Sequence, residues 1–176
     1  MRFTYVVAVF LSDQWVARMV DAFDSAKRSQ VMSRIRGRDN QTTELKLSAA
    51  FRMYGVVGWR RQVRLKPRIA SKDRGLGEAK FRLSVRPDFI FRSHKLAVFV
   101  DGCFWHGCPE HFKQPVTNSE FWANKIAMNL LRDQRATRAL EEAGWTVLRV
   151  WEHDLADLAS VIKRVVSCLS RIKISP

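Results

Sequence analysis

Two short apolar runs near the middle of the chain constrain the fold more than any other feature. The first covers residues 88–91 (DFIF) and the second covers residues 96–100 (LAVFV), with a four-residue connection, RSHK, between them. Apolar runs of this length joined by a short polar segment are typical of a β-hairpin whose two strands both lie in the core. In such a hairpin the start of the first strand lies beside the end of the second.

The rest of the chain supplies helices and further strands for the same sheet. Apolar periodicity predicts helices over 42–54, 118–143 and about 155–170, and strands over 57–65 and 146–151. Thr42 and Gly55 would bound the first helix, while a capping box of Thr117 and Glu120 would begin the second and Gly144 would end it. The order α-β-β-β-α-β-α predicts the α/β class, with a central mixed β-sheet flanked by helices.

The length of 176 residues and the 47% apolar content suit one domain, which we place at residues 25–170. Within it, residues 25–40 form a basic arm and residues 66–84 a basic loop insertion. Residues 171–176 form a C-terminal tail. Residues 1–24 are an N-terminal extension with two interpretations: an additional strand and helix, or a start placed too far upstream.

The charge balance indicates a polyanionic partner. Lys and Arg number 31 against 17 Asp and Glu, a formal net charge of +14, which favours nucleic acid over an anionic membrane or a merely solubilising surface. Three cysteines are an odd count and argue against a secreted disulfide framework. The apolar run 3–11 is too short to span a bilayer and lacks a cleavage site. We therefore expect a cytoplasmic, nucleoid-associated protein without membrane contact.

Two aspartates lie at the neighbouring strand ends of the predicted hairpin. Asp88 begins the first strand and Asp101 follows the second, so the two carboxylates should lie close together. Paired carboxylates bind hard divalent cations such as Mg²⁺, which phosphodiester hydrolysis uses to activate water. The alternative is a turn aspartate after Pro87 and an unrelated acid at the other strand end.

A cluster of thiols and imidazoles follows directly. Cys103, Cys108 and His111 have the spacing of zinc ligands, and His153, after the strand 146–151, is the proposed fourth ligand of a structural zinc site. The alternative is a pair of buried thiols with surface histidines. Cys168 lies on the apolar face of the last helix and is expected in the core.

Three residues between the two cysteines carry a second possible role. His106 is either the general base of a hydrolytic reaction or itself a zinc ligand. Phe104 and Trp105, between Gly102 and Gly107, either wedge into a base stack or pack beneath the zinc loop.

Several motifs together resemble the very-short-patch repair (Vsr) mismatch endonucleases. Residues 100–111 read V-D-G-C-F-W-H-G-C-P-E-H, with R-P-D-F before them and E-F-W-x-x-K, N-x-x-R-D and G-W-x-V-x-R-V-W-E-H after them. K-R-S-x-x-M-x-x-I in the basic arm and T-T-E-L at the first helix fit the same family. The resemblance covers roughly residues 26–153, and its motifs occur in the family's order.

The resemblance implies a restriction-endonuclease-like fold and a Mg²⁺-dependent, strand-specific nick. The nick would lie on the 5′ side of the thymine in a T·G mismatch, which arises when 5-methylcytosine deaminates. The implied partner is double-stranded DNA containing this mismatch. We expect a monomer that also contacts a repair-recruiting protein.

The resemblance also assigns roles to residues of this chain. Asp88 would bind Mg²⁺ with the backbone carbonyl of Val100, and His106 would be the general base. Glu44 and Asp133 would hold metal-bound waters or orient that base. Intercalating side chains would approach from both grooves: Phe104, Trp105 and, from the arm, Met32.

The chain departs from the family in several places. Some members carry His where this chain has Asp101, and Cys where it has His153, so Asp101 is expected to bind the metal more directly. The loop 66–84 is longer than usual. Two other functions stay open: a restriction-type endonuclease cutting both strands of matched DNA, and a zinc-containing DNA-binding module without catalysis.

Overall fold

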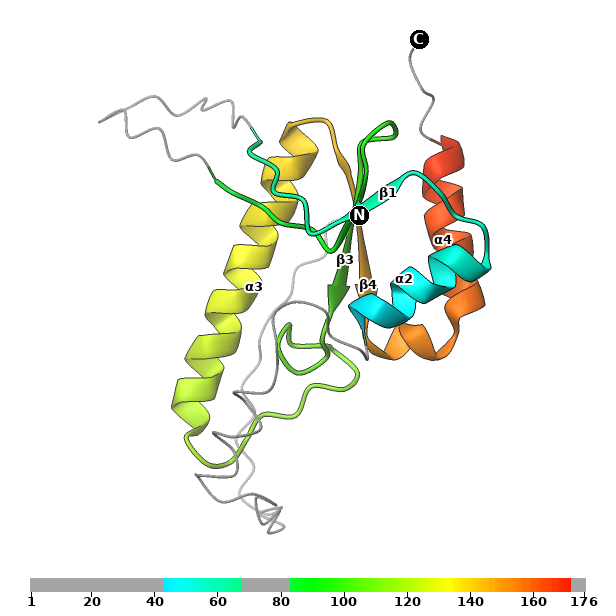
Figure 1. Ribbon diagram of the computed structural model, residues 1–176. Coiled ribbons are helices and arrows are strands. Elements are labelled where there is room, and N and C mark those ends of the chain that lie inside the picture. The colour runs from blue at the N-terminus through cyan, green and yellow to red at the C-terminus, as the bar shows by residue number, and fades with distance from the viewer. Residues whose placement is uncertain (1–42, 68–82, 172–176) are drawn as a thin grey trace, which may run out of the picture.

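The computed structural model of the protein describes residues 43–67 and 83–171 (Figure 1). The predictions for residues 1–24, for the basic arm with Met32, for most of the basic loop and for residues 172–176 lie outside the described residues. The elements in chain order are α2 Glu44–Met53, β1 Trp59–Arg61, β2 Phe89–Phe91, β3 Leu96–Asp101, α3 Ser119–Glu142, β4 Thr146–Trp151, the 3₁₀ helix η1 His153–Ala156, and α4 Leu158–Arg171.

The four strands form one mixed sheet in the order β1-β2-β3-β4. β1 pairs antiparallel with β2, and β2 pairs antiparallel with β3, with Phe89 opposite Val98. β4 returns parallel to β3 after the long helix α3, which gives the crossover that parallel neighbours require. The predicted hairpin and the predicted mixed sheet are therefore confirmed.

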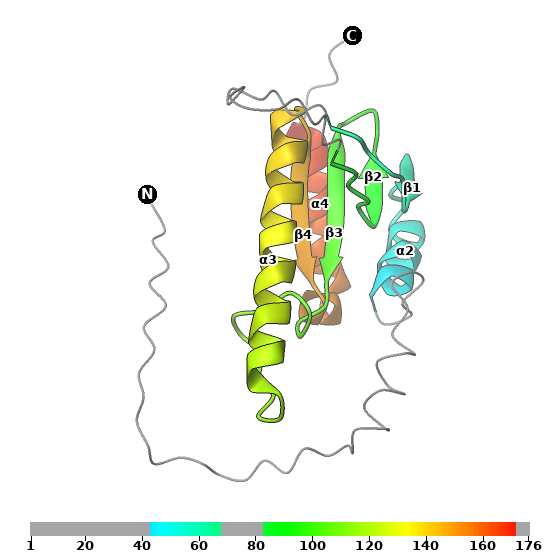
Figure 2. The same ribbon diagram turned by 90° about the vertical axis from the view of Figure 1, so that its left-hand side faces the viewer.

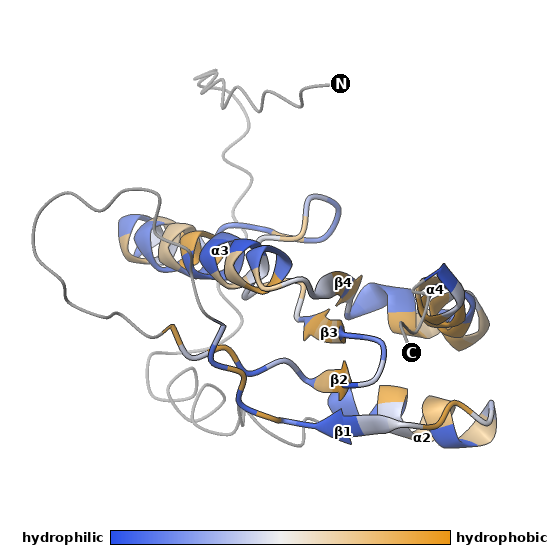
Figure 3. Cartoon of the chain, turned by 90° about the horizontal axis from the view of Figure 1, so that it is seen from above, coloured by the Kyte–Doolittle hydropathy of each residue, from blue (hydrophilic) through white to orange (hydrophobic). Residues whose placement is uncertain are grey.

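Helices cover both faces of the sheet. Seen from above, α3 lies on one face, and α4 and α2 lie on the other (Figure 3). The larger core joins α2, α4 and the sheet through buried side chains such as Phe51, Phe89 and Val165. The smaller core lies under α3, around Ala97 and Leu140. Figure 2 shows α3 running along β3 and β4 for the whole length of the strands.

Most predicted boundaries agree with the structure, but several local predictions were wrong. The N-cap of α2 is Thr43 and not Thr42, and Thr43 makes no side-chain cap hydrogen bond. The capping box at Thr117 and Glu120 does not form, because Asn118 caps α3 in a left-handed conformation (φ 54°) without a side-chain hydrogen bond. The strand predicted over 57–65 shortens to β1, because Gln62 leaves the extended conformation at φ 53°. Further along, Leu65 pairs with Val85 in an isolated bridge.

The last helix begins later than predicted, because the turn η1 precedes α4. Gly55 and Gly144 follow α2 and α3 at φ 67° and 78°, the left-handed conformation that ends helices and that glycine adopts most readily. Cys168 packs against the larger core as expected. None of the helices in residues 43–67 and 83–171 has the length and hydropathy of a membrane span.

Candidate active site

Four carboxylates gather at the end of β3. Asp88 directly precedes β2, Asp101 ends β3, Glu44 begins α2 and Asp133 lies in the middle of α3. Glu44 and Asp101 are each only 3% exposed. Buried carboxylates need hydrogen bonds or countercharges, so the partners of each one define what the site can do.

Both carboxylate oxygens of Asp88 accept a hydrogen bond, one from β3 and one from the residue after β1. The backbone N–H of Val100 donates to Asp88 Oδ2 at 2.8 Å, and the Gln62 amide donates to Asp88 Oδ1 at 3.1 Å. Burial raises the pKa of Asp88 from 3.8 to about 6, with smaller increases from Glu44 and Asp101. The Val100 hydrogen bond and His106 act in the opposite direction. Burial and, to a smaller extent, two neighbouring acids therefore disfavour the ionised carboxylate, and a bound cation would stabilise it.

Glu44 is tied to the segment that follows β1. The Arg61 Nε donates to Glu44 Oε1 at 2.8 Å, and the same Gln62 amide that contacts Asp88 donates to Glu44 Oε2 at 3.1 Å. The N-terminus of α2 thereby connects to the start of β2. A carboxylate in the first turn of a helix is also stabilised by the helix dipole.

Asp101 already has a countercharge. The guanidinium of Arg149, from the neighbouring strand β4, donates to both Asp101 oxygens at 2.6 Å from Nε and Nη2. This paired geometry is the strongest form of an arginine–carboxylate interaction. Asp101 is therefore compensated before any metal binds, which the sequence analysis did not foresee.

His106 lies between two carboxylates. Its Nδ1 is 2.5 Å from Asp133 Oδ2 and 3.6 Å from Asp101 Oδ1. Burial opposes ionisation of Asp133, yet the hydrogen bond from His106 and the charges of His106 and Arg149 lower the pKa of this carboxyl. A donor role for Nδ1 leaves Nε2 as the acceptor of the neutral ring, an assignment that follows from the hydrogen bond.

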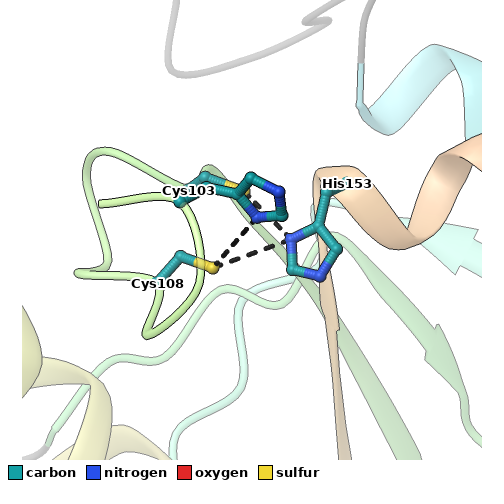
Figure 4. Close-up of side chains that lie close together, drawn as sticks. Cys103, Cys108 and His153 are labelled. Atoms are coloured by element: carbon teal, nitrogen blue, oxygen red, sulfur yellow. Dashed lines mark hydrogen bonds between the residues drawn. The ribbon is translucent and has the colours of Figure 1, made fainter. Parts of the chain in front are cut away.

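A second cluster lies on the loop after β3. Cys103, Cys108, His111 and His153 offer ligand atoms that all lie within 4.8 Å of one another. Figure 4 shows the two cysteines of this loop facing His153, which comes from the turn after β4. The structure therefore brings together the four residues predicted as zinc ligands, and His106 is not among them.

The distances in this cluster fit one tetrahedral ion. The Sγ of Cys103 and of Cys108 lie 3.3 and 3.6 Å from His153 Nδ1, and Cys108 Sγ lies 3.7 Å from His111 Nδ1. Ideal zinc–sulfur and zinc–nitrogen bonds at a tetrahedral angle give a ligand separation of about 3.5 Å. Burial and the neighbouring Cys108 raise the pKa of the Cys103 thiol, so losing its proton is costly, and a bound cation would offset that cost.

The two aromatic residues of this loop pack together against α3. The Phe104 ring lies 5.2 Å from Trp105 and 5.3 Å from Trp122, measured between ring centroids. The Asn129 side chain donates to the Trp105 carbonyl at 3.0 Å. Phe104 and Trp105 are nevertheless only half-buried. Packing on the loop is thus observed, and both residues keep part of their surface exposed.

Three polar residues that sequence reasoning missed complete the network: Arg61, Gln62 and Arg149. Arg149 was the most detectable, because an arginine inside an otherwise apolar strand requires an acidic partner. Arg61 interrupts the alternation of the strand predicted over 57–65 and Gln62 fits it as a polar position, but the sequence shows no partner for either residue.

Comparisons with known proteins agree on one family. The family described as DNA mismatch endonuclease Vsr matches residues 20–112. The DNA mismatch endonuclease Vsr of Escherichia coli is 36% identical over 140 residues, 76% of this chain and 74% of that protein. The type II nicking enzyme V.NmeAIP of Neisseria meningitidis is 30% identical over 158 residues, 88% of this chain and 98% of that enzyme.

A third relative is more similar over a shorter stretch. The type II nicking enzyme V.NaeI of Lentzea aerocolonigenes is 45% identical over 91 residues, so the chain spans about half of it, 54%. The extent of the family match and the two longer alignments decide the assignment. The chain belongs to the Vsr family of DNA mismatch endonucleases.

Proposed function

We propose that the protein is a Mg²⁺-dependent endonuclease that nicks one DNA strand on the 5′ side of the thymine in a T·G mismatch. The observation that carries this proposal is the hydrogen-bonded pair of His106 and Asp133 beside Asp88, in a chain of the Vsr family. A histidine oriented by a carboxylate next to a carboxylate suited to a cation is the pairing that water attack on a phosphodiester needs.

The start of β2 supports a cation site at Asp88. The register of the hairpin, with Phe89 opposite Val98, places Pro87 opposite Val100 when continued by two residues. Proline has no N–H, so it cannot donate to the Val100 carbonyl. Asp88 and this carbonyl are then the oxygen ligands that we assign to Mg²⁺. When bound there, the ion would activate water and stabilise the charge that develops on the phosphate.

The remaining acids have supporting roles in this proposal. Asp133 orients His106 so that Nε2 can accept the proton of the attacking water. Glu44 is linked to Asp88 by two hydrogen bonds from the Gln62 amide and would hold waters of the cation. Asp101 retains lone pairs for a cation beyond those used by Arg149, and we propose it as a secondary ligand.

The zinc-type cluster would support the loop that carries His106. We propose that Zn²⁺ joins the loop ligands Cys103, Cys108 and His111 to His153 after β4, and thereby fixes the position of His106. Phe104, Trp105 and Met32 would wedge beside the mismatch. Stacking is already weakened at a mismatch, so the distortion costs less there than in matched DNA.

Two alternatives predict different products. A restriction-type enzyme would cut both strands of matched DNA, and a binding module without catalysis would cut neither. The relatives named as nicking enzymes favour cleavage of one strand. The hydrogen-bonded His106–Asp133 pair disfavours a module without catalysis, since DNA binding alone does not use it.

The test compares a T·G duplex with the matched duplex of the same sequence, each labelled on one strand at a time, in Mg²⁺. Denaturing gels reveal nicks and native gels reveal double-strand breaks. The proposal predicts cleavage of the thymine strand of the T·G duplex only. Equal cleavage of matched DNA, or cleavage of both strands, would contradict it.

A further inference from the structure

Gln62 has a backbone conformation that requires an explanation. It lies directly after β1 at φ 53°, in the left-handed region that side chains with a Cβ rarely adopt. Its backbone N–H donates to the Asp88 carbonyl at 3.0 Å, so the turn is held against the residue that opens β2. Strained residues of this kind persist where surrounding contacts enforce them, and they cluster at functional sites.

The side chain of Gln62 joins the two acids nearest the proposed cation site. Its Nε2 donates to Glu44 Oε2 and to Asp88 Oδ1, both at 3.1 Å. The orientation of the amide follows from electrostatics. Exchanging nitrogen and oxygen would place the amide oxygen against two carboxylate oxygens, which is repulsive while both acids are ionised.

The other end of the same amide is an unused acceptor. Gln62 Oε1 is a buried side-chain atom without a hydrogen-bond partner within residues 43–67 and 83–171. Buried polar atoms almost always have a partner, and the exceptions call for a ligand, an ion or a bound water. Neither Glu44 nor Asp88 can donate to Oε1 in the ionised state.

We propose that Gln62 is a positioning residue for the divalent cation of this site. Its Nε2 holds the carboxylates of Glu44 and Asp88 at a fixed separation, and its buried Oε1 accepts a hydrogen bond from a water of the cation's hydration shell. This inference rests on the proposed function, because it takes Asp88 as the cation ligand. Mg²⁺ retains several waters when it binds proteins, and each of them needs an acceptor.

The expected effect of removing the Gln62 side chain can be taken from other residues that hydrogen-bond to metal ligands. Removing such a partner typically lowers metal affinity or activity by about 10- to 100-fold. Gln62 contacts no DNA in this scheme, so the loss should appear in the Mg²⁺ affinity and in kcat, and the KM for DNA should stay within about twofold.

The experiment measures Mg²⁺ binding to the full chain without DNA, by calorimetry and by the increase in Tm that Mg²⁺ produces over Mg²⁺-free buffer without a chelator. Gln62→Leu keeps the volume and removes both hydrogen-bonding functions. Gln62→Gly removes the side chain and suits a positive φ, so it tests the inference if the leucine variant fails to fold. Gln114→Leu is the matched control, because Gln114 is an exposed glutamine whose side chain donates hydrogen bonds to Ser119.

The expected result is an Mg²⁺ Kd about 10-fold or more weaker for both Gln62 variants and unchanged for Gln114→Leu. A Kd within twofold of wild type, with nicking at the wild-type rate, would overturn the inference. The Asp88→Asn variant distinguishes a failure of the inference about Gln62 from a failure of the proposed cation site. If Asp88→Asn abolishes Mg²⁺ binding and the Gln62 variants do not weaken it, only the role of Gln62 fails. If Asp88→Asn binds Mg²⁺ as tightly as wild type, the proposed cation site at Asp88 is wrong, and the role inferred for Gln62 fails too.

Discussion

The pair of Arg149 and Asp101 offers the most quantitative test of the electrostatics of the site. Arg149 donates to both Asp101 oxygens at 2.6 Å and also contacts Thr137, while its guanidinium lies 4.9 Å from the Phe99 ring centre. The Asp101 side chain is 5% exposed and the Arg149 side chain 27%. Arg149→Met would leave the Asp101 charge buried with His106 as its remaining ionisable partner in the described network.

The magnitude follows from burial. Removing one partner of a fully buried ion pair costs about 3–5 kcal/mol, whereas exposed pairs contribute about 0–1 kcal/mol. Arg149 is roughly one quarter exposed, so we expect a coupling energy of about 2–3 kcal/mol between the two side chains. Because Arg149→Met also loses Thr137 and the contact with Phe99, the single mutant alone would overstate this interaction.

The assay is a double-mutant cycle of Arg149→Met and Asp101→Asn, read as unfolding free energy from urea denaturation at neutral pH. The control cycle uses Arg138 and Glu142, a pair on α3 whose side chains are 83% and 34% exposed. Its coupling should stay below about 0.5 kcal/mol. A coupling for Arg149 and Asp101 as small as that of the control would refute the view that this pair is buried and mutually dependent.

Three further predictions concern the metals and the base. The wild-type protein should contain about one zinc ion per chain. Cys108→Ser should lower this content and reduce Tm by at least several degrees. An unchanged Tm would argue against a structural zinc site. In Mg²⁺-free buffer, Asp88→Asn should be more stable than wild type by up to about 3 kcal/mol above pH 6, because the raised pKa of Asp88 makes its ionisation unfavourable in the folded state. Denaturation at several pH values should show this difference vanishing below about pH 4. His106→Ala should reduce kcat for nicking about 10²- to 10⁴-fold, and Asp133→Asn should reduce kcat less. The KM for DNA should stay nearly unchanged in both variants. A wild-type rate for His106→Ala in single-turnover assays would exclude His106 as the base.

The hairpin shows how much of the fold the sequence could predict. Apolar runs separated by four polar residues leave little choice of pairing, so the predicted neighbours Asp88 and Asp101 lie in one charge network. The long helix and β4 were equally well marked by periodicity and by the β-rich run 146–151. The prediction was wrong at the start of α3. The Thr117–Glu120 spacing indicated a capping box, but Asn118 adopts a left-handed conformation and is the N-cap.

The partners within the site were less accessible to sequence reasoning. The four ligand residues of the Cys/His cluster could be named because thiols and imidazoles are rare and their spacing is restrictive. The bond from Arg149 to Asp101 depends on the parallel register of β3 and β4, which places Asp101 beside Trp151 and is not evident from either strand alone. The position of Gln62 depends on a single positive φ, for which a glutamine gives no signal.

The measurement that tests the central claim most directly compares wild type with Asp88→Ala on a T·G duplex in Mg²⁺, with DNA affinity measured in parallel. We predict that the variant binds the duplex within about fivefold of wild type and leaves both strands intact, because phosphate contacts by basic residues do not require Asp88. A variant that binds and still nicks the thymine strand at the wild-type rate would show that the reaction does not depend on this carboxylate.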